Sequence, residues 1–249
     1  MRRFFVSPTQ MAEDHFVITG KDAFHLHRVL RLGVGDVIII AAQDGRTYRG
    51  RLVFVDAKRA EGKIEEEIEE KREPQTKMTL LQALPKGDKM DQIVRQGTEL
   101  GLYRIIPVGT ERTIVRYGEE KGRKKRSRWQ KIAEEASKQA KRSLIPQVKP
   151  PKSLKEALLS DENDFDAGFV FWEKEQTCSL WQALKKAPSL GNIRLLIGPE
   201  GGLTEEEAKL SFEHGLQAVT MGPRIFRTET AALVAAAAIL YESGDLGGF

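Results

Sequence analysis

Two short glycine-containing loops near the end of the sequence have the residue types of a ligand crevice. Residues 197–202 read IGPEGG, and residues 221–230 read MGPRIFRTET. Glycine lacks a Cβ atom and lets the backbone approach a ligand closely, while proline stiffens a turn. Each loop follows an apolar stretch and precedes a helical pattern, and loops of this kind form ligand crevices at the carboxyl ends of parallel strands. We therefore expect both loops to line one site.

The second loop carries two arginines, Arg224 and Arg227, at the start of an apolar helical pattern. We expect Thr228 to cap this helix and Glu229 to lie in its first turn. Two fixed positive charges beside a ligand crevice suit an anionic partner. The alternative interpretation is that Arg227 and Glu229 merely pair with neighbouring residues for structural reasons.

The first loop leads into an acidic helix start. Thr204 and Glu207 have the spacing of a capping box, and the acids at 205–207 favour the positive end of a helix. Three carboxylates at this point would repel a phosphate group. The chain also lacks the GxGxxG and GxxxxGK[ST] motifs of nucleotide-binding loops. The sequence therefore argues against a nucleotide polyphosphate as the ligand.

The elements that carry these loops alternate between strands and helices after residue 73. Apolar runs predict strands at residues 78–84, 103–108, 167–172, 193–197 and 217–221. Helical patterns lie at residues 88–100, 129–143, 154–159, 177–186, 204–213 and 228–241. This alternation predicts an α/β domain over residues 74–249, with a mostly parallel sheet covered on both faces.

Residues 1–73 have a different pattern, which predicts a small β-barrel or β-sandwich domain. Short apolar runs at 16–18, 37–40 and 51–55 indicate strands, and Asp44-Gly45 is a hairpin signal. Residues 22–30 have helical spacing. The charged stretch 65–70 fits either an edge strand or a short helix.

The composition is that of a soluble globular protein, with 249 residues, 40% hydrophobic and 31% charged. No run of about 18 apolar residues could span a bilayer, and the first residues lack the apolar run of a signal peptide, so we expect a cytoplasmic protein without membrane contact. One cysteine and four histidines without ligand spacing predict neither a disulfide nor a metal site.

The net charge of +4 is small, but the basic residues are clustered. Lysine and arginine crowd residues 121–131 and recur at 138, 141 and 142. Such a block is either a phosphate-binding surface or a solvated helix face.

Several spaced motifs resemble those of the RsmE-type ribosomal RNA uracil-N3 methyltransferases of the SPOUT superfamily. The two loops, extended to 197–204 and 221–231, are similar to the signature of that family. Residues 1–6 and 25–32 resemble its PUA-like N-terminal domain. Residues 86–90, 98–101, 110–112 and 129–136 resemble the start of its catalytic domain. The resemblance therefore extends over the whole chain and favours RNA contact by the basic segment.

The resemblance implies a SPOUT-type sheet with a deep C-terminal trefoil knot, a homodimer, and S-adenosyl-L-methionine as cofactor. The residues implied to hold the cofactor are Leu196, Ile197, Gly198, Pro199, Glu200, Gly201, Gly202, Met221, Gly222, Ile225 and Phe226. The strand end at Trp172-Glu173 is either a third wall of this site or simply a buried strand end.

The implied reaction is methyl transfer to N3 of a specific uridine in 16S rRNA of the small ribosomal subunit. N3 carries a proton at neutral pH, so the site must accept that proton or stabilise the uracil anion. We expect Arg227 to stabilise the anion and Arg224 to orient the base or rRNA phosphates. Glu229 would either accept the proton or hold Arg227 in place, and we favour the second role.

The N-terminal domain is then expected to bind RNA. The residues implied to contact RNA are Arg2, Arg3, His27, Arg28, Arg31, Arg112 and Arg142. Methylation of ribose 2′-hydroxyls by a related SPOUT enzyme and a non-catalytic RNA-binding protein are the alternatives. Nucleoside analysis of the modified RNA distinguishes ribose methylation from base methylation. Calorimetry that shows no binding of S-adenosyl-L-methionine would support the non-catalytic alternative.

Overall fold

The computed structural model describes residues 2–70, 72–114, 117–160 and 164–247. The chain forms two compact units, and each is built from two separate segments. The first unit contains Met1–Glu73 and Ser137–Ile145, and the second contains Pro74–Ala136 and Pro146–Phe249.

The first unit contains a five-stranded sheet with the order β1-β3-β4-β5-β2. Its strands are β1 (Arg3–Phe5), β2 (His15–Thr19), β3 (Val37–Ala41), β4 (Thr47–Val55) and β5 (Arg59–Ile68). β1 runs parallel to β3, and the other pairs are antiparallel. The predicted hairpin at Asp44-Gly45 is confirmed, because Ala41 pairs with Thr47 across it. β5 continues to Ile68, so the acidic stretch is a strand up to that residue.

One core lies inside this sheet. Alternate strand residues point into it, and its large members include Phe4, Phe16, Ile18, Leu26, Ile38, Ile40, Tyr48 and Leu52. The described strands therefore form one sheet around one core, unlike the two packed sheets of a sandwich. A 3-10 turn spans Pro8–Gln10, and the predicted helical stretch consists of α1 (Gly20–Phe24) and a π-helical turn, η2 (His25–Val29).

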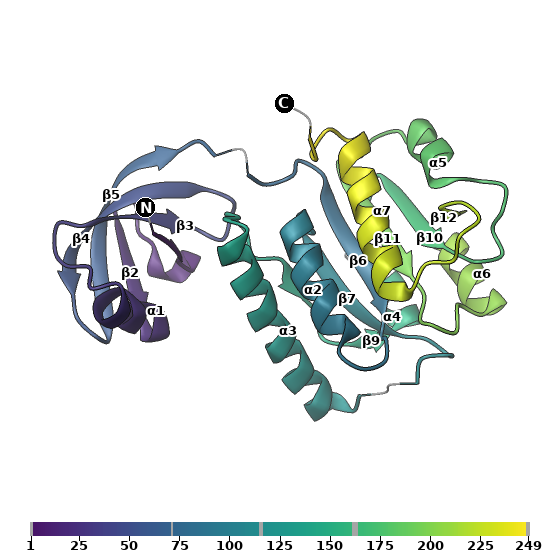
Figure 1. The fold of residues 1–249 in the computed structure, drawn as a ribbon, viewed down its shortest axis with the longest axis horizontal. Coiled ribbons are helices and arrows are strands. Elements are labelled where there is room, and N and C mark those ends of the chain that lie inside the picture. Colours follow the sequence, from purple (N-terminus) through teal and green to yellow (C-terminus); the bar gives the residue numbers. More distant parts are fainter. Residues whose placement is uncertain (1, 71, 115–116, 161–163, 248–249) are drawn as a thin grey trace. The chain divides into compact units, whose positions relative to one another are not determined.

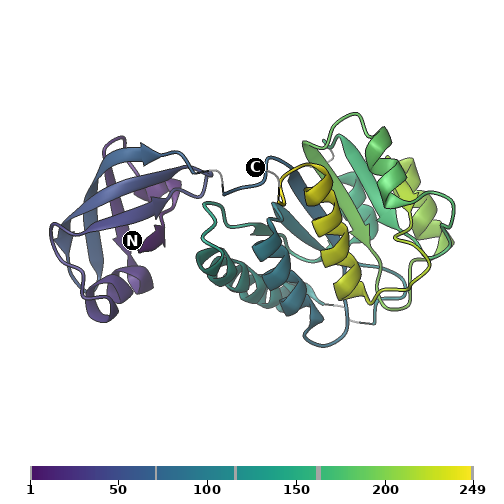
Figure 2. The same ribbon diagram turned by 45° about the horizontal axis from the view of Figure 1, so that its top comes forward.

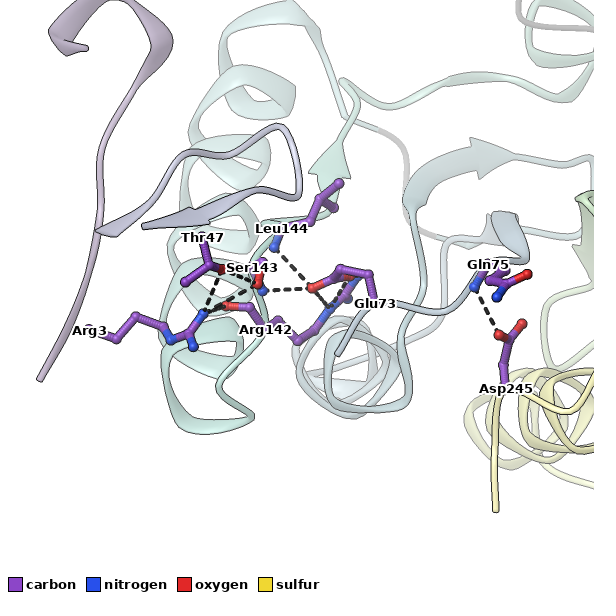
Figure 3. Close-up of polar contacts among 8 residues, drawn as sticks. All are labelled: Arg3, Thr47, Glu73, Gln75, Arg142, Ser143, Leu144 and Asp245. Atoms are coloured by element: carbon purple, nitrogen blue, oxygen red, sulfur yellow. Dashed lines mark hydrogen bonds and ion pairs between the residues drawn. The ribbon is translucent and has the colours of Figure 1, made fainter. Parts of the chain in front are cut away.

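A polar cluster holds the segment Ser137–Ile145 in the first unit (Figure 3). The Arg142 side chain is 4% exposed, and its Nη2 lies 2.6 Å from Glu73 Oε2. Glu73 Oε1 also accepts hydrogen bonds from the backbone N–H groups of Ser143 and Leu144, at 2.7 and 3.0 Å. Arg3 Nη1 donates to Ser143 Oγ at 3.3 Å. These contacts give Arg142 and Arg3 structural partners within the unit.

The second unit contains a sheet with the order β12-β10-β11-β6-β7-β8, and β9 pairs with β7. Its strands are β6 (Lys77–Ala83), β7 (Arg104–Gly109), β8 (Gln147–Val148), β9 (Lys152–Ser153), β10 (Ala167–Phe171), β11 (Asn192–Ile197) and β12 (Leu216–Val219). Within the described residues each strand pairing of this sheet is parallel, which confirms the predicted α/β sheet.

Helices cover both faces of this sheet (Figures 1 and 2). The helices are α2 (Lys89–Leu100), α3 (Glu119–Gln139), α4 (Leu154–Leu159), α5 (Leu180–Lys186), α6 (Glu205–Glu213) and α7 (Thr228–Glu242). α2 and α7 lie side by side on one face. On the other face, Leu154 and Leu158 of α4 join Leu81, Val170 and Leu196 in a buried cluster.

The predicted bounds of two helices were wrong. α3 begins at Glu119 and ends at Gln139, whereas the prediction was 129–143. Its first turns carry charges rather than apolar spacing, and Glu120 pairs with Lys124 one turn later at 2.7 Å. α5 begins at Leu180 rather than at residue 177, because Ser179 caps it in a capping box.

Asp245 ties the end of the second unit to the start of β6 (Figure 3). Its Oδ1 and Oδ2 accept hydrogen bonds from the backbone N–H groups of Gln75 and Thr76, at 2.8 and 3.0 Å. Burial alone would raise the pKa of Asp245, but the bonds from Thr76 and Gln75 outweigh it and lower the pKa.

We expect Asp245→Asn to lower the free energy of unfolding at pH 7. A carboxyl whose pKa is lowered by folding stabilises the fold above its ordinary pKa, here 3.8, and this contribution is lost as pH falls through the lowered value. Urea unfolding at pH 7 and at pH 3 measures the difference between wild type and variant. The difference should be smaller at pH 3; an equal difference at both values would contradict this role.

Within the described ranges, no helix is long and apolar enough to cross a membrane. No group of three or more metal-ligating side chains is found in the same ranges.

Candidate active site

Three neighbouring parallel strands of the second unit, β10, β11 and β12, end at the same edge of the sheet. The first glycine loop follows β11, the second follows β12, and Trp172-Glu173 follows β10. The Glu173 carboxylate lies against the first loop, since a Cβ atom at Gly202 would be only 2.3 Å from Glu173 Oε1. The three strand ends therefore form one region.

The second glycine loop is open to solvent. Gly222 has a φ of +96°, which favours glycine, and apart from its own chain neighbours no described residue lies within 4 Å of the position of its missing Cβ. Ile225 is 94% exposed, and Met221 and Phe226 are half-buried. Solvent-exposed apolar side chains that line a crevice are typical of a ligand site.

The first glycine loop presents mainly backbone. Leu196 and Ile197 end β11 and are buried in the sheet core, so their side chains are not available to a ligand. The predicted capping box is confirmed: Thr204 Oγ1 accepts a hydrogen bond from Glu207 N, and Glu207 Oε2 accepts one from Thr204 N.

A buried chain of hydrogen bonds joins the first loop to the start of α7. Gln82 Nε2 donates to Thr228 Oγ1 at 2.9 Å, and Thr228 Oγ1 donates to Gly198 O at 2.7 Å. The prediction that Thr228 caps α7 was wrong, because Arg227 holds the N-cap position and makes no side-chain cap bond. The Thr228 hydroxyl instead fixes the two loops relative to each other.

Lys89 bridges two carboxylates of the site. Its Nζ lies 2.9 Å from Glu200 Oε1 and 3.2 Å from Glu229 Oε2. Glu200 Oε1 also accepts a hydrogen bond from Lys86 N at 3.2 Å. The hydrogen bond with Glu200 raises the pKa of Lys89. Burial alone would raise the pKa of Glu200, but the bond from Lys89 outweighs it and lowers the pKa.

Glu229 is therefore a partner of Lys89. It is 8% exposed, and in the described part of the chain no ion pair joins it to Arg227. The Arg227 and Arg224 side chains are exposed beside the second loop.

We expect Lys89→Met to lower the melting temperature by roughly 2–4 °C at pH 7, because two carboxylates lose their shared cation. The lowered pKa of Glu200 stabilises the fold above about pH 4.5, and the raised pKa of Lys89 stabilises it below about pH 10.5. Calorimetry across pH should show the largest difference inside this window, with Lys89→Arg close to wild type. A constant difference at every pH would exclude the bridge as its cause.

The residues predicted to contact RNA fall into separate groups. Arg112 lies in the second unit, where its Nη1 donates to Gly201 O at 2.8 Å and so supports the first loop. The other predicted residues, Arg2, Arg3, His27, Arg28, Arg31 and Arg142, lie in the first unit. Of these, Arg2, Arg28 and Arg31 are exposed, whereas Arg142 is buried against Glu73.

Sequence reasoning assigned no role to Gln82 and Lys89. Gln82 is a fully buried amide between the apolar residues Leu81 and Ala83, and a buried polar residue in such a run is a usable signal. Lys89 lies in the 86–90 motif, but its two partners are more than 100 positions away, at Glu200 and Glu229.

Two family models match the chain. Residues 71–240 match an RNA methyltransferase domain, and residues 18–65 match an RNA methyltransferase PUA domain.

Similar proteins cover the full length. The ribosomal RNA small subunit methyltransferase E of Bacillus subtilis is 37% identical over 255 residues, covering 100% of this chain and 99% of the relative. The protein of the same name from Synechocystis is 32% identical, covering 95% of this chain and 76% of the relative. A crystal structure of the Neisseria gonorrhoeae methyltransferase E bound to S-adenosyl methionine has a TM-score of 0.80 and 35% identity, covering 96% of this chain and 97% of that one. The chain therefore belongs to the ribosomal RNA small subunit methyltransferase E family.

Proposed function

We propose that this protein transfers the methyl group of S-adenosyl-L-methionine to N3 of a specific uridine in 16S rRNA of the small ribosomal subunit. The observation that carries the proposal is the junction of both glycine loops at one sheet edge, with exposed Arg224 and Arg227 beside them. The names of the full-length relatives support the same reaction class.

The loops fit this cofactor. The open space at Gly222 and the uncovered Ile225 side chain suit an adenine ring, and the backbone of Gly198, Glu200 and Gly201 offers polar groups to its edge. Leu196, Ile197, Pro199, Gly202, Met221 and Phe226 complete the proposed set. When bound, the cofactor supplies an electrophilic methyl group on its sulfonium.

Arg227 would act on the uridine. A uracil that loses its N3 proton carries negative charge on its ring, and a fixed guanidinium beside that ring stabilises the charge. Among the described residues no carboxylate pairs with Arg227, so its charge remains available to the substrate. Arg224 would orient the base or the rRNA phosphates.

Glu229 would hold Arg227 in position and would not accept the N3 proton. Its carboxylate is buried beside Lys89, and Lys89 links the start of α7 to Glu200. We infer that the lysine bridge holds the second loop, and Arg227 with it, in the reactive arrangement.

The family resemblance also supports an RNA-binding first unit, a homodimer, a trefoil knot in the second unit and action in the cytoplasm. Arg2, His27, Arg28 and Arg31 are the residues of the first unit whose predicted RNA contact we retain.

The test is a methylation assay with small ribosomal subunits that lack the modification. Purified protein, subunits and labelled S-adenosyl-L-methionine are incubated, and the RNA is digested to nucleosides for mass spectrometry. N3-methyluridine as the labelled product supports the proposal. A 2′-O-methylated nucleoside, or no label despite cofactor binding, would refute it.

A further inference from the structure

An open hollow of about 500 Å³ lies in the first unit, whereas the glycine loops belong to the second unit. Its lining residues are His27, Arg28, Arg31, Leu32, Gly33, Val34 and Val55. We propose that this hollow binds one unpaired nucleotide of the RNA, with the base on the apolar residues and the phosphate at the two arginines. The choice of RNA as partner rests on the proposed function.

The backbone of the hollow has an unusual conformation. The π-helical turn η2 closes with a hydrogen bond from Leu30 N to His25 O at 2.9 Å, and Leu32 N donates to Leu26 O at 3.1 Å. Arg31 has a φ of +54°, a conformation that non-glycine residues adopt rarely. π-helical turns and strained residues occur preferentially at functional sites. Here the strained turn places Arg28 and Arg31 on the wall of the hollow.

The ionisable side chains that line the hollow in the described part of the chain are basic, namely His27, Arg28 and Arg31. Two acids adjoin it, Asp36 and Asp56, and the pKa of Asp56 is lowered by backbone hydrogen bonds from Lys58 and Arg59 and by the nearby His27. Both carboxylates are held by backbone groups of their own turns. Asp36 Oδ2 accepts a hydrogen bond from Gly33 N at 2.8 Å, and Asp56 Oδ1 accepts from Lys58 N and Arg59 N at 2.6 and 2.7 Å. In the described parts of the chain, Arg28 and Arg31 are exposed and have no ion-pair partner. Both guanidinium groups are therefore available to a phosphate.

The apolar side chains of the hollow favour a nucleotide over a simple anion as its ligand. Leu32, Val34 and Val55 contribute to its lining, and Val34 is 71% exposed. A phosphate or a carboxylate would use the arginines and leave these side chains in water. A splayed base presents a flat apolar face next to its phosphate, as in recognition of single-stranded RNA.

Fluorescence anisotropy of a labelled single-stranded oligouridine, titrated with the full chain over a range of salt concentrations, tests the proposal. We expect Arg28→Ala/Arg31→Ala to raise Kd at least about tenfold and to reduce the salt slope by about 1–2. Val34→Asn should raise Kd by about threefold to tenfold without changing the salt slope, because it removes a stacking surface and no charge. The matched control Arg46→Ala/Lys63→Ala removes the same charge from exposed positions outside the hollow and should bind within about twofold of wild type.

Circular dichroism establishes that each variant is folded. Equal weakening by the two double variants would overturn the proposal, since charge alone would then explain binding. If Val34→Asn bound oligouridine as tightly as wild type and polyglutamate displaced the oligouridine, the nucleotide proposal would be overturned in favour of an acidic peptide as the ligand. Formation of N3-methyluridine is measured in parallel, so unchanged oligouridine binding by the hollow variants refutes the hollow alone, whereas absence of methylation by wild type refutes the proposed function.

Discussion

Arg227→Ala is expected to lower the single-turnover methylation rate by a factor of about 10²–10³, because it removes the preorganised charge beside the developing uracil anion. Affinity for S-adenosyl-L-methionine should stay within about twofold, since the proposed cofactor contacts come from backbone and apolar groups. Rapid-quench kinetics with unmodified small subunits and calorimetry of cofactor binding measure the two quantities separately.

Arg224→Ala is the matched control, because it removes an exposed arginine from the same loop. We expect it to raise KM for the subunit more than it lowers the single-turnover rate. If Arg227→Ala retained near-normal turnover, or if both variants lost the rate equally, Arg227 would have no special role in the reaction.

Arg142→Ala is expected to reduce the free energy of unfolding of the first unit by about 3 kcal/mol. Removing one member of a buried ion pair leaves an uncompensated charge, which costs about 3–5 kcal/mol, and the partial exposure of Glu73, 20%, places the effect at the lower end. The same substitution also releases the backbone of Ser143 and Leu144 from a well-held carboxylate.

The control is Arg46→Ala, which breaks the exposed pair with Asp44 and should cost less than about 1 kcal/mol. Urea denaturation followed by circular dichroism compares the two. Equal stabilities of the two variants would show that the Glu73–Arg142 pair does not hold the segment. If Arg142→Ala lost RNA affinity without losing stability, the prediction that Arg142 contacts RNA would be supported instead.

The sheet of the second unit could be predicted because its strands are short apolar runs bounded by turns. Residues 193–197 and 78–84 are apolar runs of strand length, and parallel pairing follows from the intervening helices. α3 was misplaced for the opposite reason. Its first turns are held by charged pairs such as Glu120–Lys124, and these pairs give no apolar period.

The two loops of the site could be predicted from the sequence, but their side-chain contacts could not. Glycine and proline mark where the chain must turn, so both loops were found from residue types alone. The partners of Glu229 and Thr228 come from distant parts of the sequence, Lys89 and Gln82. Local rules therefore assigned Thr228 to a cap and Glu229 to Arg227, whereas the fold gives each a partner that only the sheet brings near.

The most direct test of methylation at uridine N3 is mass spectrometry of 16S rRNA from cells with and without this protein. We expect one N3-methyluridine to disappear when the protein is absent, and wild-type protein, unlike Arg227→Ala, to restore it. An unchanged N3-methyluridine content, or the loss of a ribose-methylated nucleotide instead, would contradict this expectation.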